Sequence, residues 1–473
     1  MTMIPTLQTA QIRLAQHYLG KLRVAAEAVS RGGANLSYGL KLFEHEMPHI
    51  QHWQAHSVQY ASVIDRWAQM CKEFPIAGSE VLAIRHTPTG RRDWWKAALE
   101  AARSLQDREA ERVILSNLAK AFSGLGDLEK TEQCAYQLLE LAHEAQDSLH
   151  IGKALYDLGT IFEDRGKHAE AASCYQQCQT IFDELGLDID RGRALLGLGS
   201  IATVTGDYLA AFTYFQEYLG IVEIGGKVSD LCFALLAVSE ALRYLKRYDE
   251  VEIFIQRSIQ LCQTLDYQWA LGPSLIAMGV CAMEQGKLES ASEYLEKGVQ
   301  VARDSGAQRD VIYGLSSLGY VYYRRECAGE SIDLLQEALR LAGEAGMLYC
   351  TCYIERNLAY VYLDLNDLAA ARDALVGSLT IARDLALRPD TIKALTCAVA
   401  YGHATGRHEQ AAHWAGFLMD DPDVDLADFQ PVCEGIEAAL GTEHFREMLA
   451  RGKRYATDDI INEVLALPSS KVT

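Results

Sequence analysis

Apolar and polar residues alternate along this chain in a pattern typical of paired helices. In the stretch LGTIFEDRGKHAEAASCYQQC (158–178), apolar residues recur every three or four positions on both sides of Gly166. This spacing predicts two amphipathic helices joined by a tight turn. Steps of 40 residues along the chain reach further pairs of turn-forming residues, which are Gly126-Asp127, Gly206-Asp207, Gly286-Lys287, Asn366-Asp367 and Gly406-Arg407.

Small residues keep the same 40-residue register as the turns. Seven residues before the turn they are Ala119, Gly159, Gly199, Ser239, Gly279, Gly319 and Ala359, and only Val399 departs. Five residues after the turn they are Ala171, Ala211, Ala291, Ser331, Ala371 and Ala411, with Thr131 and Val251 as exceptions. Two helices that cross closely need small residues at the crossing. Because one hairpin cannot bury its apolar face alone, the copies must stack.

The register predicts an all-α, right-handed solenoid with three regions. Residues 112–431 hold eight helical hairpins, and residues 432–473 form a C-terminal helical cap. Residues 1–111 form an N-terminal helical cap that ends in one degenerate repeat. Within this cap we expect a helix that begins near Pro48, because proline is tolerated in a first helical turn. We expect a break over FPIAGSEVLAIRHTPTG (74–90).

Composition narrows the classes of partner and location. The net charge of −20 and the pI near 5.1 argue against nucleic acid as the main partner, because phosphate binding needs many Lys and Arg side chains. No apolar run is long enough to cross a bilayer, and the N-terminal residues show no signal peptide, so we expect a cytoplasmic protein without a membrane partner. The 12 cysteines lack zinc-site spacing and are expected to be free, buried thiols. No cofactor is predicted.

The repeat columns resemble the tetratricopeptide repeat, whose pattern has a small residue at position 8, Ala at position 20 and an aromatic residue at position 24. Gly159, Ala171 and Tyr175 occupy these places. The 40-residue form is similar to the sensor halves of bacterial signal-transduction ATPases with numerous domains. The flanks LKLFEHEMPHIQHWQAH (40–56) and ALGTEHFREMLARGKRYATDDIINEVLAL (439–467) also look like the helix before such repeats and the tail after them. The resemblance implies a regulatory role.

The resembled regulators carry a nucleotide-binding domain, and nothing in this sequence matches one. The nearest lookalike of a phosphate-binding loop is GIVEIGGKVS (220–229). Its glycine spacing is off by one, and Val228 stands where the motif requires a hydroxyl that binds Mg²⁺. A helix end at Gly225-Gly226 is the better interpretation. We therefore expect a sensor half without its nucleotide-binding domain, or one that acts in trans.

The stretch HEMPH, from His45 to His49, fits the zinc motif H-E-x-x-H. That motif needs both histidines on one continuous helix, and Pro48 disfavours a helical conformation of Met47. A zinc hydrolase built on His45, Glu46 and His49 is therefore the least favoured function. The alternatives are adventitious metal, for which His49, His52 and His56 share one helix face, and a polar helix flank.

In tetratricopeptide arrays the first helix of each repeat lines the concave groove. Alignment on the small-residue column places thirteen side chains there, which are Tyr156, Glu163, Arg193, Glu240, Arg243, Tyr244, Tyr313, Tyr320, Tyr323, Arg324, Tyr353, Arg356 and Tyr360. Tyr and Arg are enriched in binding hot spots. Arg324 and Arg356 are candidates to clamp a carboxylate, and Asn117 and Asn357 are candidates to bind a peptide backbone. The alternative is that several of the tyrosines pack between repeats.

The sequence therefore predicts a non-catalytic binding or sensor module. It recognises a peptide, a protein or a small effector in the concave groove and relays binding to an effector. The main alternative is a constitutive scaffold that assembles proteins through its convex face and its caps. The oligomeric state and the identity of the ligand stay open.

Overall fold

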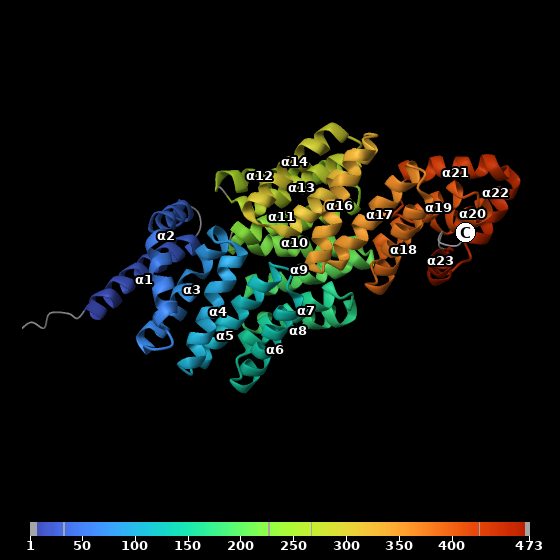
Figure 1. Ribbon diagram of the computed structural model, residues 1–473. Helices are drawn as coiled ribbons and strands as arrows, with labels where there is room; N and C mark the ends of the chain where they lie inside the picture. The colour runs from blue at the N-terminus through green and yellow to red at the C-terminus, as the bar shows by residue number, and fades with distance from the viewer. Residues whose placement is uncertain (1–6, 32–33, 226–227, 266, 425, 469–473) are drawn as a thin grey trace, which may run out of the picture.

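The computed structural model describes residues 7–31, 34–225, 228–265, 267–424 and 426–468. These ranges are entirely helical apart from short connections (Figure 1). The helices are α1 Leu7–Arg31, α2 Ala34–Tyr60, α3 Asp65–Arg85, α4 Pro88–Ser104, α5 Arg108–Ser123, α6 Leu128–Glu144, α7 Ser148–Asp164, α8 His168–Glu184, α9 Asp188–Thr205, α10 Tyr208–Gly225, α11 Val228–Tyr244, α12 Tyr248–Thr264, α13 Gln268–Glu284, α14 Leu288–Ser305, α15 Gln308–Arg324, α16 Ala328–Ala345, α17 Leu348–Asp364, α18 Leu368–Asp384, α19 Arg388–Ala404, α20 His408–Leu418, α21 Leu426–Leu440, α22 Thr442–Gly452 and α23 Thr457–Leu465.

Helices α5 to α20 form eight stacked hairpins, which confirms the predicted all-α solenoid. Every hairpin turn has a residue with positive φ at the predicted 40-residue spacing, at positions 126, 166, 206, 246, 286, 326, 366 and 406. Lys246 (φ 59°), Glu326 (φ 61°) and Asn366 (φ 57°) take this conformation without being glycine. The turn geometry therefore persists in copies whose sequence lacks the glycine signal.

The Gly-Asp pairs end one helix and begin the next. Gly126 has a φ of 73°, which allows the left-handed end of α5. The side chain of Asp127 then accepts a hydrogen bond from the backbone N–H of Lys130, at 3.1 Å, and caps α6. Asp367 caps α18 in the same way, by accepting from the N–H of Ala370.

Close helix crossings fix the geometry of each hairpin. A Cβ atom placed on Gly159 would lie 2.7 Å from the ring of Tyr175, and one on Gly199 would lie 2.3 Å from the ring of Phe215. At Gly279 the same atom would lie 2.6 Å from Leu295. In these three hairpins the glycine of the first helix therefore faces a large residue of the second helix, 16 positions later, and this contact limits how closely the two helices approach.

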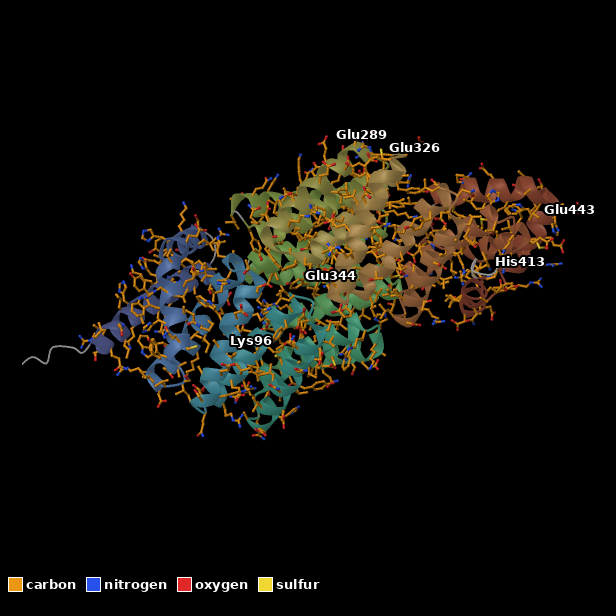
Figure 2. The ribbon with its side chains drawn as sticks, viewed as in Figure 1. Lys96, Glu289, Glu326, Glu344, His413 and Glu443 are labelled. Carbon is orange, nitrogen blue, oxygen red and sulfur yellow. The ribbon has the colours of Figure 1, made fainter. Side chains whose placement is uncertain are left out.

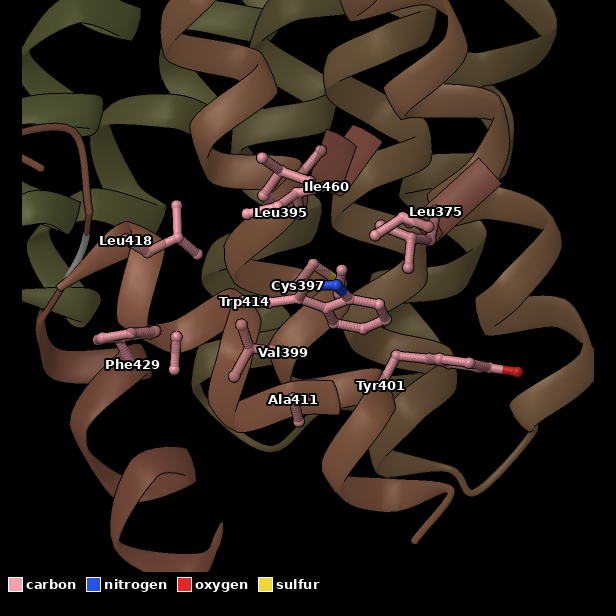
Figure 3. Close-up of a cluster of buried hydrophobic side chains, with 14 of the residues drawn as sticks. Leu375, Leu395, Cys397, Val399, Tyr401, Ala411, Trp414, Leu418, Phe429 and Ile460 are labelled. Atoms are coloured by element: carbon pink, nitrogen blue, oxygen red, sulfur yellow. The ribbon is translucent and has the colours of Figure 1, made fainter. Parts of the chain in front are cut away.

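The C-terminal helices extend the core beyond the eighth hairpin. Trp414 of α20 is fully buried, with Cys397 and Val399 of α19 beside it (Figure 3). Phe429 of α21 and Ile460 of α23 belong to the same cluster. The division into residues 1–111, 112–431 and 432–473 stays a prediction; α21 continues across its second boundary.

The N-terminal region corrects two predictions. Helix α2 continues through Pro48 and does not begin there, and α3 continues through Pro75, so the break expected over residues 74–90 is confined to residues 86 and 87. Proline removes the N–H that would bond the carbonyl four residues earlier. For Pro75 that carbonyl belongs to Cys71, and it accepts a hydrogen bond at 3.3 Å from the side-chain amide of Gln54. A neighbouring helix thus supplies the missing donor.

The array of hairpins curls until distant turns meet (Figure 1). The Nε2 atom of His168 lies 2.9 Å from the backbone oxygen of Leu385, 217 residues further along the chain. Arg309 of α15 pairs with Asp164 of α7 at 3.3 Å. Arg388 pairs with Asp421 at 2.7 Å and with Asp423, which also accepts a hydrogen bond from Tyr208. These contacts enclose the inner surface of the solenoid.

Acidic side chains such as Glu289 and Glu326 project from the edge of the solenoid (Figure 2). All twelve cysteines are free and eleven are buried, as predicted. Within the described ranges, no helix combines the length and the apolar character needed to cross a membrane. Gly226 and Lys227 of the phosphate-loop lookalike lie outside the described residues.

We predict that Gly199→Ala destabilises the chain by about 1–3 kcal/mol, because the new methyl group meets the buried ring of Phe215. Gly220→Ala is the matched control: it also lies inside a helix, but its Cβ would have no atom within 4 Å. The control should be neutral or more stable by up to about 1 kcal/mol, since alanine favours helix. Urea denaturation of both variants measures the difference, and equal shifts would contradict the crossing argument.

A second pair of variants tests the contact between distant turns. Gly166 and Gly286 have φ values of 71° and 75°, so alanine strains both turns by about 1–2 kcal/mol. Only at Gly166 would the new Cβ collide with the backbone of Leu385, at 2.4 Å, whereas Gly286 has open space. We expect Gly166→Ala alone to increase the radius of gyration and to accelerate hydrogen exchange at residues 385–388. Small-angle X-ray scattering and hydrogen exchange measure these two changes. A Gly166→Ala variant with an unchanged radius of gyration and unchanged exchange at residues 385–388 would contradict the contact.

Candidate binding site on the inner surface

Two adjoining pockets lie on the enclosed inner surface. The first, of about 310 Å³, we name the tyrosine pocket; it is lined by Arg243, Tyr244, Lys246, Tyr248, Val280, Met283, Glu284, Tyr313, Tyr320, Tyr349, Tyr353, Arg356, Asn357, Tyr360, Asp390, Lys393, Thr396, Pro422, Asp423, Val424 and Leu426. The second, of about 490 Å³, we name the acidic pocket; it is lined by Tyr156, Thr160, Glu163, Tyr175, Leu196, Gly197, Ser200, Phe215, Phe233, Leu236, Ala237, Ser239, Glu240, Arg243, Val251, Ile255, Pro273, Ile276, Ala277, Val280, Arg309, Asp310 and Tyr313. Arg243, Val280 and Tyr313 line both, so the two pockets adjoin at these residues.

The first helices of the hairpins supply most of the tyrosine pocket. Helices α11, α13, α15, α17 and α19 each contribute side chains, and the connection from α20 to α21 completes the wall. These helices lie side by side because the hairpins stack in register. One pocket therefore depends on five successive hairpins.

Ten of the thirteen predicted groove residues line these pockets. The tyrosine pocket contains Arg243, Tyr244, Tyr313, Tyr320, Tyr353, Arg356 and Tyr360. The acidic pocket contains Tyr156, Glu163, Glu240, Arg243 and Tyr313. Arg193, Tyr323 and Arg324 line neither. Arg193 instead pairs with Asp190 at 3.3 Å and Asp230 at 3.0 Å, and Tyr323 packs against Tyr320 with ring centroids 5.7 Å apart.

Arg324 and Arg356, the candidates to clamp a carboxylate of a ligand, do not line the same pocket. Arg356 is buried, pairs with Asp390 at 2.9 Å, and stacks over Tyr353 at 4.6 Å. Arg324 ends α15 outside both pockets. The side chains of the two candidate asparagines also bond within the protein: Asn117 donates to the carbonyl of Val113, and Asn357 donates to Ser316.

Sequence reasoning missed Lys393 of the tyrosine pocket. It stands in the same repeat column as Tyr313 and Tyr353, each 40 residues apart, so the register carried the signal. Val399 breaks the small-residue column in the eighth hairpin, so the sequence pattern that would align Lys393 with the groove is weaker there. Asp423 follows the last hairpin, where the periodicity ends, and no sequence signal pointed to it.

The charges of the tyrosine pocket are nearly all paired. Arg243 forms an ion pair with Glu284 and lies over the ring of Tyr244 at 4.3 Å. Arg356 is held by Asp390. Lys393 lies over the ring of Tyr244 at 5.7 Å, and it forms no ion pair or hydrogen bond with any residue of the described ranges. Burial, and then the cationic Arg356, lower the pKa of Lys393.

The acidic pocket holds three carboxyl groups. Glu163 accepts hydrogen bonds from the hydroxyls of Tyr175, at 2.8 Å, and Ser200, and burial raises its pKa to about 7. Burial also raises the pKa of Asp310, to about 6. The side chain of Glu240 is exposed to solvent in the pocket. The helices that surround it still desolvate its carboxyl group, and this desolvation raises the pKa of Glu240 as well. In the described part of the chain, Glu240 and Asp310 have no hydrogen-bond or ion-pair partner.

The HEMPH stretch lies far from both pockets in sequence, on α2. Because α2 is continuous, it places His45 and His49 one turn apart, against our expectation for Pro48. His45 has an 83% exposed side chain, and its Nδ1 atom lies 3.6 Å from Glu46, while His49 stacks on Tyr18. Among all described residues, no three His, Cys, Asp or Glu side chains are grouped to hold a metal ion.

Comparison with protein families identifies tetratricopeptide repeats in this chain. One family model of the tetratricopeptide repeat matches residues 110–184 and 150–224, and a second matches residues 273–305. Comparison with curated proteins gave no match.

Solved structures resemble this chain at low sequence identity, and one of them has a TM-score above 0.5. A Rap protein complexed with competence and sporulation factor is 13% identical, covers 80% of this chain and 99% of its own, and has a TM-score of 0.57. Aspartyl phosphate phosphatase F from Bacillus subtilis is 13% identical, with coverages of 81% and 96% and a TM-score of 0.46. A signal-transduction ATPase with numerous domains and a tetratricopeptide repeat sensor, from Pyrococcus horikoshii, is 16% identical, with coverages of 69% and 52% and a TM-score of 0.39. The chain is thus a helical solenoid that contains tetratricopeptide repeats.

The raised pKa of Glu163 makes a prediction about stability. Between its ordinary pKa of 4.5 and about 7, the folded chain keeps a proton that the unfolded chain has released. The free energy of unfolding therefore falls, through this group, as pH rises across that window. Glu163→Gln removes this slope, so its melting temperature should rise relative to that of the wild type between pH 4.5 and 7.5. Glu144→Gln, at an exposed position, is the control; a constant offset for Glu163→Gln would contradict the pKa shift.

Proposed function

We propose that this chain is a sensor module that binds a short peptide in the two adjoining pockets and relays binding to an associated effector. The observation that carries the proposal is the construction of the tyrosine pocket from five hairpins and the connection from α20 to α21. A ligand in that position touches repeats that are distant in sequence. Its binding energy can then bias the curvature of the whole solenoid.

The chemistry of the lining favours a peptide. Tyrosine rings offer rigid apolar area together with a hydroxyl, which suits side chains and backbone amides alike. Tyr313 and Tyr353 stack with centroids 5.7 Å apart and form a firm wall. The pockets are concave and mix apolar surface with a few charged groups, as ligand sites do.

A structural relative supports a ligand for this fold. The Rap protein with a TM-score of 0.57 was solved in complex with competence and sporulation factor. By analogy, we infer that the helical solenoid of this chain also accommodates a bound factor. The sequence resemblance to sensor halves of signal-transduction ATPases favours a regulatory role, with the nucleotide-binding or effector part supplied separately. We place the protein in the cytoplasm.

The contacts that enclose the inner surface offer a route for the relay. The turn at His168 touches Leu385, and Tyr208 and Arg388 converge on Asp423, which itself lines the tyrosine pocket. A ligand against Asp423 therefore lies one side chain away from the contacts that hold the solenoid closed. We infer that binding changes these contacts and so signals to the effector.

The test is affinity selection by the full chain from a pool of random synthetic hexapeptides with free termini. We expect a defined subset to bind, and Tyr313→Ala with Tyr353→Ala to weaken it by about tenfold or more. Tyr136→Ala, at a 48% exposed position on α6, is the control and should leave binding unchanged. Hydrogen exchange at residues 385–388 should change when the selected peptide binds.

Other results would redirect the assignment. Peptides that bind equally well to the Tyr313/Tyr353 double variant would place the site elsewhere, as the scaffold alternative requires. Binding without any change in exchange at residues 385–388 would support a passive scaffold over a sensor.

A further inference from the structure

Two lysines of the tyrosine pocket have no counter-ion among the described residues: Lys246, which is exposed to solvent, and Lys393, which is part-buried. Arg243 and Arg356 are each paired with a carboxylate of the same pocket, Glu284 and Asp390. Lys393 is part-buried, lies beside Tyr244 at 5.7 Å, and has no ion pair within 4 Å among the described residues. An ammonium group removed from bulk water without a partner is unfavourable. An incoming anion that reaches it would relieve that penalty.

The acidic pocket carries the opposite charge. Glu240 and Asp310 face the same enclosed space and are without a hydrogen-bond or ion-pair partner in the described chain. The remaining charged groups there are engaged: Arg309 pairs with Asp164, and Glu163 accepts two hydrogen bonds. Unmatched negative charge in one pocket therefore adjoins unmatched positive charge in the other.

Arg243 and Tyr313 mark the border between the two pockets, because both residues line each of them. The path from Lys393 to Glu240 runs past Tyr244 and Arg243, since Lys393 contacts the ring of Tyr244 and Arg243 lies on the same ring. A single extended ligand can therefore reach both charges. The solenoid fixes the positions of these two charges in the adjoining pockets.

We infer that the ligand is a peptide bound in one direction, with its free C-terminal carboxylate on Lys393 and its N-terminal ammonium facing Glu240 and Asp310. This inference rests on the proposed function and specifies the ligand of that site. A monoanion fits better than a phosphate group, because Glu284, Asp390 and Asp423 line the same pocket as Lys393 and would repel a second negative charge. The arginines that would otherwise bind a phosphate bidentately already hold carboxylates.

The experiment compares matched peptide pools on the full chain. The peptides selected above are synthesised as free acids, as C-terminal amides and as N-acetylated acids, and their dissociation constants are measured by calorimetry. We expect the amide to bind about tenfold more weakly than the acid, from the loss of one charge-assisted bond. The N-acetylated form should also bind more weakly.

Variants assign each end of the peptide. Lys393→Gln should weaken the acid and leave the amide unchanged, so that the preference between them disappears. Glu240→Gln combined with Asp310→Asn should abolish the preference for a free N-terminus alone. Lys297→Gln, at an exposed position on α14, is the control for removal of a lysine, and melting temperatures check that each variant is folded.

The outcomes separate this inference from the proposed function. Acid and amide forms that bind equally well, with no effect of Lys393→Gln, would overturn the direction of binding while leaving a peptide sensor intact. A preference for the acid that persists in Lys393→Gln would overturn the assignment of the peptide carboxylate to Lys393 while leaving a peptide sensor intact. Failure of every pool to bind the wild-type chain would overturn both the inference and the proposed function.

Discussion

The close crossing of two helices within each hairpin is the constraint on which the rest of this structure depends. Glycine or another small residue on the first helix receives a large side chain of the second, as Gly159 receives Tyr175 and Gly199 receives Phe215. There is no room for a Cβ atom at Gly159 or Gly199, so each of these glycines allows the two helices of its hairpin to approach closely. Because each hairpin repeats this angle and stacks on the next, small rotations accumulate along the chain. The curl of the solenoid is the sum of those rotations.

The curl has a chemical consequence, because it brings turns together that are more than 200 residues apart. The contact of His168 with Leu385 and the convergence of Tyr208 and Arg388 on Asp423 turn an open groove into an enclosed space. Enclosure reduces access to bulk water, and the pKa values of Glu163 and Asp310 rise as a result. Charges in such a space interact more strongly with a ligand than charges on the outer surface would.

Pairing decides which of these charges remain for a ligand. The sequence made Arg356 a candidate binding residue, but its guanidinium group already forms an ion pair with Asp390. Lys393, Glu240 and Asp310 stay unmatched, and they lie in adjoining pockets of opposite charge. A sensor needs binding to alter a global equilibrium, and here the pocket wall and the closing contacts share Asp423. In the proposed sensor, Asp423 would therefore link ligand binding to the contacts that close the solenoid.

The sequence by itself determined the local order of this protein. The 40-residue period predicted eight hairpins and their turns, because helix period, turn residues and small crossing residues all act within a few positions of each other. It predicted the face of the first helices well enough to name most of the pocket-lining tyrosines. The features that depend on residues distant in the sequence were decided only by the tertiary structure. Gln54 satisfies the carbonyl that Pro75 leaves free, so a helix continues where a break was expected. Asp390 neutralises Arg356, and Asp423 joins a pocket from outside the repeats. Such contacts arise from the summed curvature of many hairpins, and no local pattern of residues records that sum.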